Sequence, residues 1–287
     1  MTPTLRACLW MIGAIVSFTS MAIAGRQVSF ALDTFEIMTY RSLLGIVIVC
    51  LIAALSGTWR QINGQQLGLH AVRNLAHFAG QNLWFFAIAV IPLAQVFALE
   101  FTTPIWVLLL SPLLLGERMT RIGAIAALIG FVGVLIVTRP GSAPVSPGLI
   151  AAALCAVCFA FSAIFTRRLT RTQTITCILF YLTTMQAIFG LVCAGWDGDM
   201  ALPDATTLPW LVLIGCAGLF AHFCLTTALS LAPASVVMPV DFVRLPTIAI
   251  VGALAYGEVI DPWILLGAAL IFGGNYLNIT RGQARPT

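Results

Sequence analysis

The sequence predicts an all-α integral membrane protein, with ten transmembrane helices arranged as two inverted five-helix repeats. Three observations predict this fold class: an almost uncharged composition, a series of long apolar runs, and a repeat of the chain on itself. Of the 287 residues, 60% are hydrophobic and 8% are charged, whereas a soluble domain has about 25% charged residues. Such a chain cannot cover itself with a water-facing surface, so we expect lipid to be its solvent.

The apolar runs predict helices rather than barrel strands. Backbone inside a bilayer must satisfy its own hydrogen bonds, which leaves helices and closed barrels as spanning structures. The runs have the length of about 20 residues that a helix needs to cross the hydrocarbon core, whereas barrel strands alternate over about 10. Short polar joints separate ten predicted spans, at residues 5–24, 35–55, 67–89, 92–115, 120–138, 147–166, 174–195, 207–230, 233–255 and 262–280.

The chain repeats itself at a fixed offset of 141 residues. The matched pairs include Phe18 with Phe159, Arg26 with Arg167, Tyr40 with Tyr181, Pro92 with Pro233, Gly116-Glu117 with Gly257-Glu258, and Gly133 with Gly274. In a chain this apolar, matched arginine, tyrosine, proline and Gly-Glu pairs are far less expected by chance than matched leucines. We therefore expect two repeats, residues 1–141 and 142–287, which is a common plan among secondary transporters.

The distribution of arginine predicts the orientation of the helices. The chain carries 14 basic residues, all of them arginine, scattered at helix ends rather than gathered into a nucleic-acid-binding patch. With the N-terminus inside, the inner joints carry Arg6, Arg60, Arg118, Arg121, Arg167, Arg168, Arg171, Arg281 and Arg285, and the outer joints carry Arg26 and Arg139. Positive charge accumulates on the cytoplasmic side, so both termini are expected there. Since five spans per repeat is an odd number, the second repeat enters from the opposite side and is inverted.

Polar side chains in two of the predicted spans point to a cavity. At helical spacing on one face lie His70, Asn74, His77, Gln81 and Trp84 in the third span, and His222, Thr226 and Ser230 in the eighth. His222 follows Gln81 by the repeat offset, so both repeats place a hydrogen-bonding side chain at related positions. The structural alternative is a set of satisfied packing residues, which is less expected for a whole stripe than for a lone histidine.

A second polar group lies in the fourth and ninth spans, which carry Gln95, Glu100, Trp106, Asp241 and Arg244. Glu100 and Asp241 are repeat equivalents, and Arg244 lies one helical turn from Asp241. We therefore expect a charged cluster near the membrane midplane. Two interpretations remain open: a substrate or proton site, or a buried ion-pair network that only fixes helix register. Trp84 and Trp106 are expected to stack a flat ligand, whereas the nearby Phe78, Phe85 and Phe86 are expected to contact lipid.

Other charged and helix-breaking residues are expected to be structural. Arg73 is expected to anchor the cytoplasmic end of its span, and Glu36 and Arg41 to lie at the opposite interface. The Gly-Glu pairs are expected to act as hinges, with the glycine ending one helix and the glutamate facing the N-terminus of the next. Prolines recur in the fourth and ninth spans, at Pro92, Pro104, Pro112, Pro233, Pro239 and Pro246, and predict bends there.

The repeat pattern resembles the EamA group of the drug/metabolite transporter superfamily. Each half closes with a proline, an apolar helix, Gly-Glu and a glycine-bearing last helix, over residues 91–117 with 121–141 and 232–258 with 262–280. The resemblance implies ten helices and alternating access, with amino acids, nucleotide-related metabolites, vitamins or drugs as cargo across the bacterial inner membrane. Residues 33–41, 70–74 and 241–246 look most similar to uptake members for riboflavin and S-adenosylmethionine.

The expected function is therefore secondary transport of a small organic metabolite, with riboflavin uptake as the leading prediction. The alternatives are S-adenosylmethionine uptake and export of amino acids or other metabolites. No enzyme activity, metal or cofactor is expected, because the spans hold no nucleophile-base or metal-ligand spacing. The expected partners are a small-molecule substrate and the lipid bilayer, with no nucleic acid. Proton coupling through Glu100, Asp241 or His222 is a further hypothesis.

Overall fold

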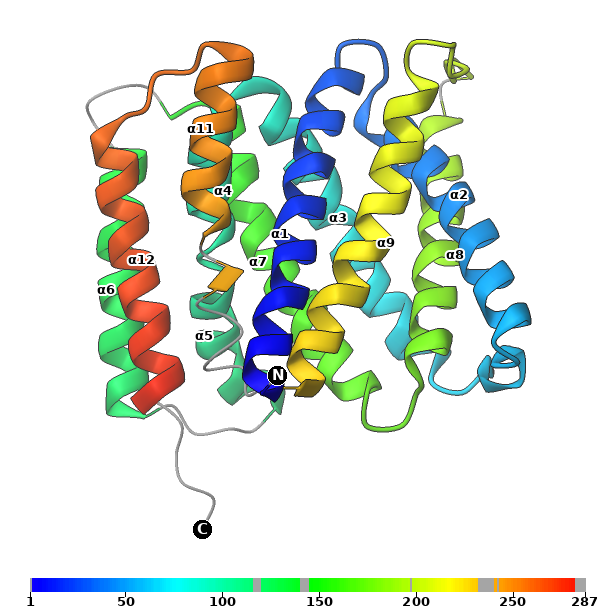
Figure 1. The fold of residues 1–287 in the computed structure, drawn as a ribbon, viewed down its shortest axis with the longest axis horizontal. Coiled ribbons are helices and arrows are strands. Elements are labelled where there is room, and N and C mark those ends of the chain that lie inside the picture. Colours follow the sequence, from blue (N-terminus) through cyan, green and yellow to red (C-terminus); the bar gives the residue numbers. More distant parts are fainter. Residues whose placement is uncertain are drawn as a thin grey trace.

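The computed structural model describes residues 2–115, 120–139, 145–196, 198–231, 240–241 and 243–281, and their regular structure is helical. The elements are α1 (Pro3–Val28), α2 (Thr34–Leu55), the 3-10 helix η1 (Trp59–Gln61), α3 (Leu67–Val90), α4 (Leu93–Glu100), α5 (Thr103–Leu115), α6 (Arg121–Thr138), α7 (Pro147–Leu169), α8 (Ile175–Ala194), α9 (Leu208–Leu231), α11 (Arg244–Tyr256) and α12 (Pro262–Arg281). The helices stand side by side in one bundle (Figure 1), and the boundaries of eight of the ten predicted spans agree closely with theirs. The fourth span divides into α4 and α5, and residues 233–239 of the ninth, with Pro233 and Pro239, lie outside the described residues.

Local sequence explains where several of these helices begin. Thr2, Thr120, Ser146 and Thr174 each accept a hydrogen bond from a backbone N–H in the first turn of the helix that follows. Asp33 and Glu36 form a reciprocal capping box at the start of α2. These caps satisfy backbone donors that have no partner within the helix, so they fix where each segment enters the bundle.

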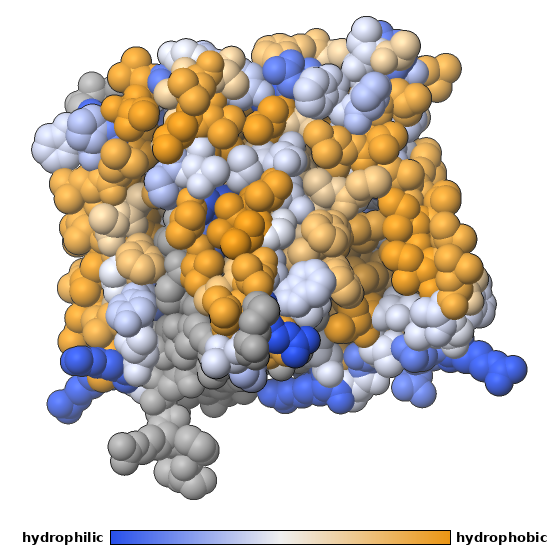
Figure 2. Space-filling model, in the orientation of Figure 1, coloured by the Kyte–Doolittle hydropathy of each residue, from blue (hydrophilic) through white to orange (hydrophobic). Residues whose placement is uncertain are grey.

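The ends of the bundle differ in what they carry. Pro3, the first residue of α1, and Arg281, the last of α12, lie at the same end, at the bottom of Figure 1. We name this the terminal end and the opposite one, where α1 ends at Val28, the distal end. Hydrophilic side chains line the terminal end in Figure 2, whereas apolar side chains cover much of the face between the ends.

The surface of the bundle suits a lipid environment. Large apolar side chains such as Leu113, Leu128 and Leu254 are exposed, at 82%, 66% and 83% of their surface. Within the described residues, seven helical segments are long and apolar enough to cross a membrane, which is fewer than the ten predicted spans. The three predicted spans that are not among the seven correspond to α3, whose polar stripe lowers its hydropathy, to α11, which is short, and to α12.

Helix pairs, each joining the first half of the chain to the second, form the most extensive contacts: α1 with α9, α2 with α8, α3 with α7, and α6 with α12. Small residues allow the α6–α12 pair to approach closely. A Cβ atom built on Gly133 would lie 2.6 Å from the Gly267 carbonyl oxygen, and one on Gly274 would lie 2.6 Å from that of Ala126. Close backbone approach of this kind is how helices associate in lipid, where burial of apolar surface gives no driving force.

This packing predicts opposite effects for two adjacent glycines. Gly274→Ala should lower the free energy of unfolding by about 1–3 kcal/mol, because the new methyl group meets backbone that cannot move aside. Gly273→Ala is the matched control, since its Cβ would meet no atom within 4 Å. That substitution should leave stability unchanged or raise it by up to about 1 kcal/mol through helix propensity. Thermal unfolding of both variants in the same detergent measures the difference; equal midpoints would contradict this account of the α6–α12 contact.

Candidate functional site

A buried ion-pair cluster lies where α4 ends and α11 begins. Arg244 begins α11, and its Nη2 atom donates to Asp241 Oδ2 at 3.0 Å and to Glu100 Oε1 at 3.2 Å. Glu100 is the last residue of α4 and also accepts a 2.8 Å hydrogen bond from Trp84 Nε1 on α3. The side chains of Arg244, Glu100 and Asp241 are 5%, 15% and 13% exposed. The expected cluster is thus present, and with two carboxylates to one guanidinium it carries a formal excess of one negative charge.

Aromatic rings surround the Arg244 guanidinium. Its Cζ atom lies 4.8 Å from the ring centre of Phe18, 5.0 Å from that of Phe97 and 4.9 Å from that of Phe101. Each distance falls within the range of a cation–π interaction, which gains strength when water is excluded. The rings therefore fix the arginine and keep the cluster in an environment of low polarity. In the sequence Phe18 stands out only as the repeat match of Phe159, since a single aromatic residue in an apolar span does not indicate a binding role.

The predicted span over residues 92–115 is present but is not one continuous helix, because the chain breaks into α4 and α5 directly after Glu100. Pro104 explains the break: it has no N–H to donate, and its ring would clash with the Glu100 carbonyl one turn earlier. The buried side chain of Asn275 on α12 donates to the freed Phe101 carbonyl at 2.8 Å. Broken helices whose exposed backbone is satisfied within the protein are typical of binding sites at membrane depth.

The polar stripe of α3 faces the interior, as its spacing predicts. His70, Asn74, His77 and Gln81 are all at most 6% exposed. The His77 ring lies 6.3 Å from that of His222 on α9, and its Nδ1 lies 3.3 Å from the Ser162 hydroxyl. In the described part of the chain, His77 Nε2 and Gln81 Oε1 have no hydrogen-bond partner. Buried polar atoms are rarely left unpaired, so these two atoms are available to a ligand or to water.

Phe18 connects the histidines with the charged cluster. Its ring lies 5.6 Å from that of His222, on the side of α1 that also contacts Arg244. The polar face of α3 and α9 and the ion pairs of α4 and α11 therefore belong to one continuous region of the interior.

A small cavity, with a volume of about 20 Å³, extends this region between α2, α8 and α9. The residues that bear on its chemistry are Arg41, Ser42, Thr183, Gln186, Gly218 and His222. Arg41 was expected at the membrane interface and instead lines this cavity. The sequence did indicate a polar face on α8, because Thr183 and Gln186 lie one helical turn apart in a mostly apolar span.

Arg73 was expected to anchor a helix end, and that expectation is wrong. Its side chain is buried, and it donates to Asn74 Oδ1 at 2.7 Å and to Thr166 Oγ1 at 2.9 Å. Asn74 in turn donates to the Tyr181 carbonyl at 3.2 Å, so its amide is largely occupied. Arg73 therefore helps to hold α3 against α7 within the bundle.

The remaining predicted site residues lie outside these clusters. Gln95 is half-buried in the first turn of α4, and the Trp106 indole packs edge-on against Phe131 of α6, with ring centres 5.4 Å apart. The side chain of Thr226 lies outside the described residues. The structure thus brings together Trp84, Glu100, Asp241 and Arg244 in one cluster and His77 with His222 in a second, and it places neither Gln95 nor Trp106 with them.

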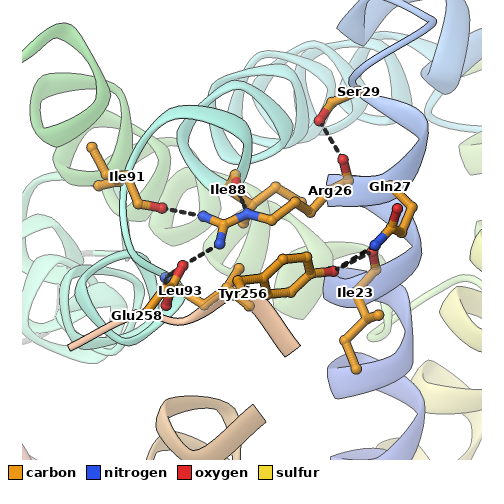
Figure 3. A network of polar contacts seen from close by, with 9 residues as sticks. All are labelled: Ile23, Arg26, Gln27, Ser29, Ile88, Ile91, Leu93, Tyr256 and Glu258. Carbon is orange, nitrogen blue, oxygen red and sulfur yellow. Dashed lines mark hydrogen bonds and ion pairs between the residues drawn. The ribbon is translucent and has the colours of Figure 1, made fainter. Parts of the chain in front are cut away.

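A separate polar network lies at the distal end of the bundle (Figure 3). Arg26, at the end of α1, forms an ion pair with Glu258 and also donates to the Ile88 and Ile91 carbonyls. The Glu258 carboxylate accepts from the N–H of Leu93, the first residue of α4, at 3.0 Å and 3.2 Å. We name these contacts the distal latch, because they tie α1, α3 and α4 to the segment that follows α11.

The Gly-Glu pair has a different role from the expected one. Gly257 ends α11 in the left-handed conformation, with φ of 65°, as expected of a helix-terminating glycine. Glu258, however, faces the N-terminus of α4 rather than that of α12. Gly252 leaves room for this carboxylate, since a Cβ at Gly252 would lie 2.3 Å from Glu258 Oε2. A carboxylate at the positive end of a helix is stabilised by the helix dipole.

Comparisons with known proteins agree with this architecture. The profile of the EamA-like transporter family matches residues 5–139 and again residues 146–280. A riboflavin transporter of Vibrio cholerae is 28% identical over 93% of this chain and 90% of its own length. An S-adenosylmethionine uptake transporter of Rickettsia bellii is 22% identical over 91% of this chain and 89% of its own. One crystal structure of a protein superposes with a TM-score of 0.66 at 21% identity, covering 94% of this chain and 95% of that one, which supports the fold alone.

Proposed function

The chain belongs to the EamA-like transporter family, and we propose that it moves a small organic metabolite across the bacterial inner membrane by alternating access. The observation that carries this proposal is the buried cluster of Glu100, Asp241 and Arg244. Charge at membrane depth is costly and usually marks a substrate or ion pathway. Here the cluster lies where α4 ends and α11 begins, and Phe18 connects it with His222. The neighbouring His77 has a ring nitrogen without a partner among the described residues.

In this proposal the protein has ten membrane helices, and its halves, residues 1–141 and 142–287, are inverted repeats. The pairing of helices supports the symmetry. At an offset of 141 residues α1 corresponds to α7 and α3 to α9, so exchanging the halves converts the α1–α9 contact into the α7–α3 contact. The α2–α8 and α6–α12 contacts convert into themselves. A pseudo-two-fold axis in the membrane plane gives this pattern.

Both termini are proposed to lie in the cytoplasm. Exposed arginines support this orientation, because Arg6, Arg60, Arg121, Arg168 and Arg281 all belong to the terminal end. Arg139 is at the distal end, where it forms an ion pair with Asp261. The positive-inside rule then assigns the terminal end to the cytoplasm and the distal end to the periplasm.

Alternating access of the cavity is proposed to depend on two ion pairs: the Arg26–Glu258 pair of the distal latch and its repeat equivalent at the terminal end. At the repeat offset, Arg26 corresponds to Arg167 and Glu258 to Glu117. The sequence therefore supplies the same pair of charges for the terminal end, although Glu117 and the side chain of Arg167 lie outside the described residues. Formation of one pair while the other is broken would open the cavity to one side at a time.

For the cargo, we propose riboflavin as the first candidate and S-adenosylmethionine as the second. The riboflavin transporter among the relatives and the aromatic walls at Phe18, Trp84 and Phe97 support a flat ligand. Expression in a riboflavin auxotroph that lacks its own carrier tests the first candidate. Growth on micromolar vitamin is expected; no growth, with the protein detected in the membrane, would rule riboflavin out. Metabolite export would instead raise resistance to toxic amino-acid analogues.

Proton coupling is proposed at the charged cluster. Asp241 Oδ1 is buried and has no partner in the part of the chain that the structure describes, and the cluster holds one carboxylate more than it has guanidinium groups. Binding of a proton or of a cationic substrate group would neutralise that excess. We expect an uncoupler to reduce accumulation of the cargo several-fold in intact cells. Accumulation that is unaffected both by the uncoupler and by external pH would contradict coupling.

A further inference from the structure

Arg41 lies in a setting built around its guanidinium group. It is located in the third turn from the start of α2 and lines the cavity between α2, α8 and α9. Gly218 of α9 packs against it without a side chain, since a Cβ there would lie 3.2 Å from Arg41 Nη2. A larger residue at Gly218 would press on the guanidinium, so the space around this charge depends on the residue opposite.

No carboxylate neutralises Arg41 within the described residues. Its side chain donates to the Met38 sulfur at 3.6 Å, and a thioether is a weak acceptor. Arg26 and Arg244 each form ion pairs with carboxylates, and the buried Arg73 donates to the side chains of Asn74 and Thr166. A cation inside the membrane is expected to pair with an anion or to face a cavity, and Arg41 does only the second.

Further donors accompany Arg41. Gln186 of α8 is 2% exposed, lines the same cavity, and its Nε2 atom has no acceptor among the described residues. The hydroxyl-bearing side chain of Ser42 also lines the cavity. A guanidinium with an unpaired amide N–H group and a hydroxyl is the donor set that binds carboxylates and phosphates.

From this arrangement we propose that the cavity binds an anionic group of the transported metabolite, a carboxylate or a phosphate, through Arg41 and Gln186. His222 lines the cavity and contacts Phe18, which lies on Arg244, so the anion subsite continues into the aromatic region. The substrate class is then a flat ring system with an acidic substituent at one end. This inference rests on the proposed function. It predicts that a flavin phosphate binds more tightly than riboflavin itself, and that the carboxylate of S-adenosylmethionine contributes to its binding.

Matched ligand pairs test the subsite on the purified full-length protein. Riboflavin and riboflavin 5′-phosphate differ only in the phosphate, and S-adenosylmethionine and its decarboxylated form differ only in the carboxylate. The acidic member of at least one pair should bind wild type about tenfold or more tightly than its partner. Arg41→Gln should weaken that acidic ligand by about 10- to 100-fold, the range for hydrogen bonds to charged groups. The other member should change by less than about twofold, and Arg41→Lys should be intermediate.

Arg60→Gln is the control, because it removes an exposed arginine from η1 and should leave all affinities unchanged. The inference would be overturned if wild type bound both ligands of each pair with equal affinity. It would also be overturned if Arg41→Gln weakened the binding of both ligands of a pair equally. If wild type transports riboflavin but shows no preference for an acidic partner, the subsite fails while the proposed function stands. If no candidate is transported, inorganic phosphate and acetate serve as probes. If phosphate or acetate raises the midpoint of thermal unfolding of wild type but not that of Arg41→Gln, the subsite is supported. If the two proteins respond equally to both anions, the subsite is refuted.

Discussion

Arg244→Gln should reduce substrate uptake by at least tenfold and destabilise the protein. The substitution leaves Glu100 and Asp241 buried without their shared cation, and breaking a buried ion pair from one side costs about 3–5 kcal/mol. Removal of the guanidinium also deletes its contacts with Phe18, Phe97 and Phe101. Uptake per folded molecule, together with the midpoint of thermal unfolding in detergent, measures both effects.

A fully neutral variant separates transport from stability. Combining Glu100→Gln, Asp241→Asn and Arg244→Gln removes every charge of the cluster, and such replacements often restore much of the stability that a single truncation loses. If the cluster binds substrate or protons, the midpoint of thermal unfolding of this variant should lie closer to that of wild type than the midpoint of Arg244→Gln does. The variant should still fail to transport. Recovery of both stability and transport would contradict the proposed role and would leave the cluster as a device that fixes helix register.

Glu258→Gln should open the distal latch. The amide keeps an acceptor for the Leu93 N–H but removes the charge that pairs with Arg26, and a hydrogen bond to a charged group contributes roughly 1.5–3 kcal/mol. Hydrogen exchange in residues 87–95 should therefore accelerate by roughly 10- to 100-fold, because each 1.4 kcal/mol is a factor of ten. Transport should also fall, since the distal end would no longer close reliably.

The matched control for this latch is Arg139→Gln, which removes another arginine of the distal end. Arg139 is 43% exposed along its side chain, and its ion pair with Asp261 is expected to contribute at most about 1 kcal/mol. Exchange in residues 87–95 should stay at the wild-type rate in this variant. Unchanged exchange in Glu258→Gln, or equal acceleration in both variants, would show that the latch does not hold the distal end closed.

Sequence patterning predicted the helices well because lipid imposes a simple rule on span length. The fourth span departs from the prediction, because the apolar run continues through residues 101 and 102 but the helix does not. Pro104 indicated a bend there, but nothing nearby in the sequence indicated that Asn275, 174 residues away, would donate to the Phe101 carbonyl. Long-range satisfaction of a single carbonyl cannot be inferred from hydropathy.

The part of the candidate site that could be predicted is the part whose residues correspond to each other at the repeat offset. The offset paired Glu100 with Asp241, and helical spacing added Arg244, which the ion pairs of the structure match. Their role in substrate binding stays a prediction. Arg41 and Glu258 were misjudged because each depends on a distant neighbour: the absent side chain of Gly218 in one case and Arg26 in the other. No spacing rule connects residues so far apart in the chain.

Counterflow in proteoliposomes tests the central claim most directly. Vesicles containing the purified protein are loaded with an unlabelled candidate, either riboflavin, riboflavin 5′-phosphate or S-adenosylmethionine, and are diluted into the labelled compound. We expect transient accumulation of label for at least one of these compounds with wild type, and none with the fully neutral variant. Absence of counterflow for all three with well-folded wild type would contradict the proposed cargo, and equal counterflow by the neutral variant would contradict the role of the charged cluster.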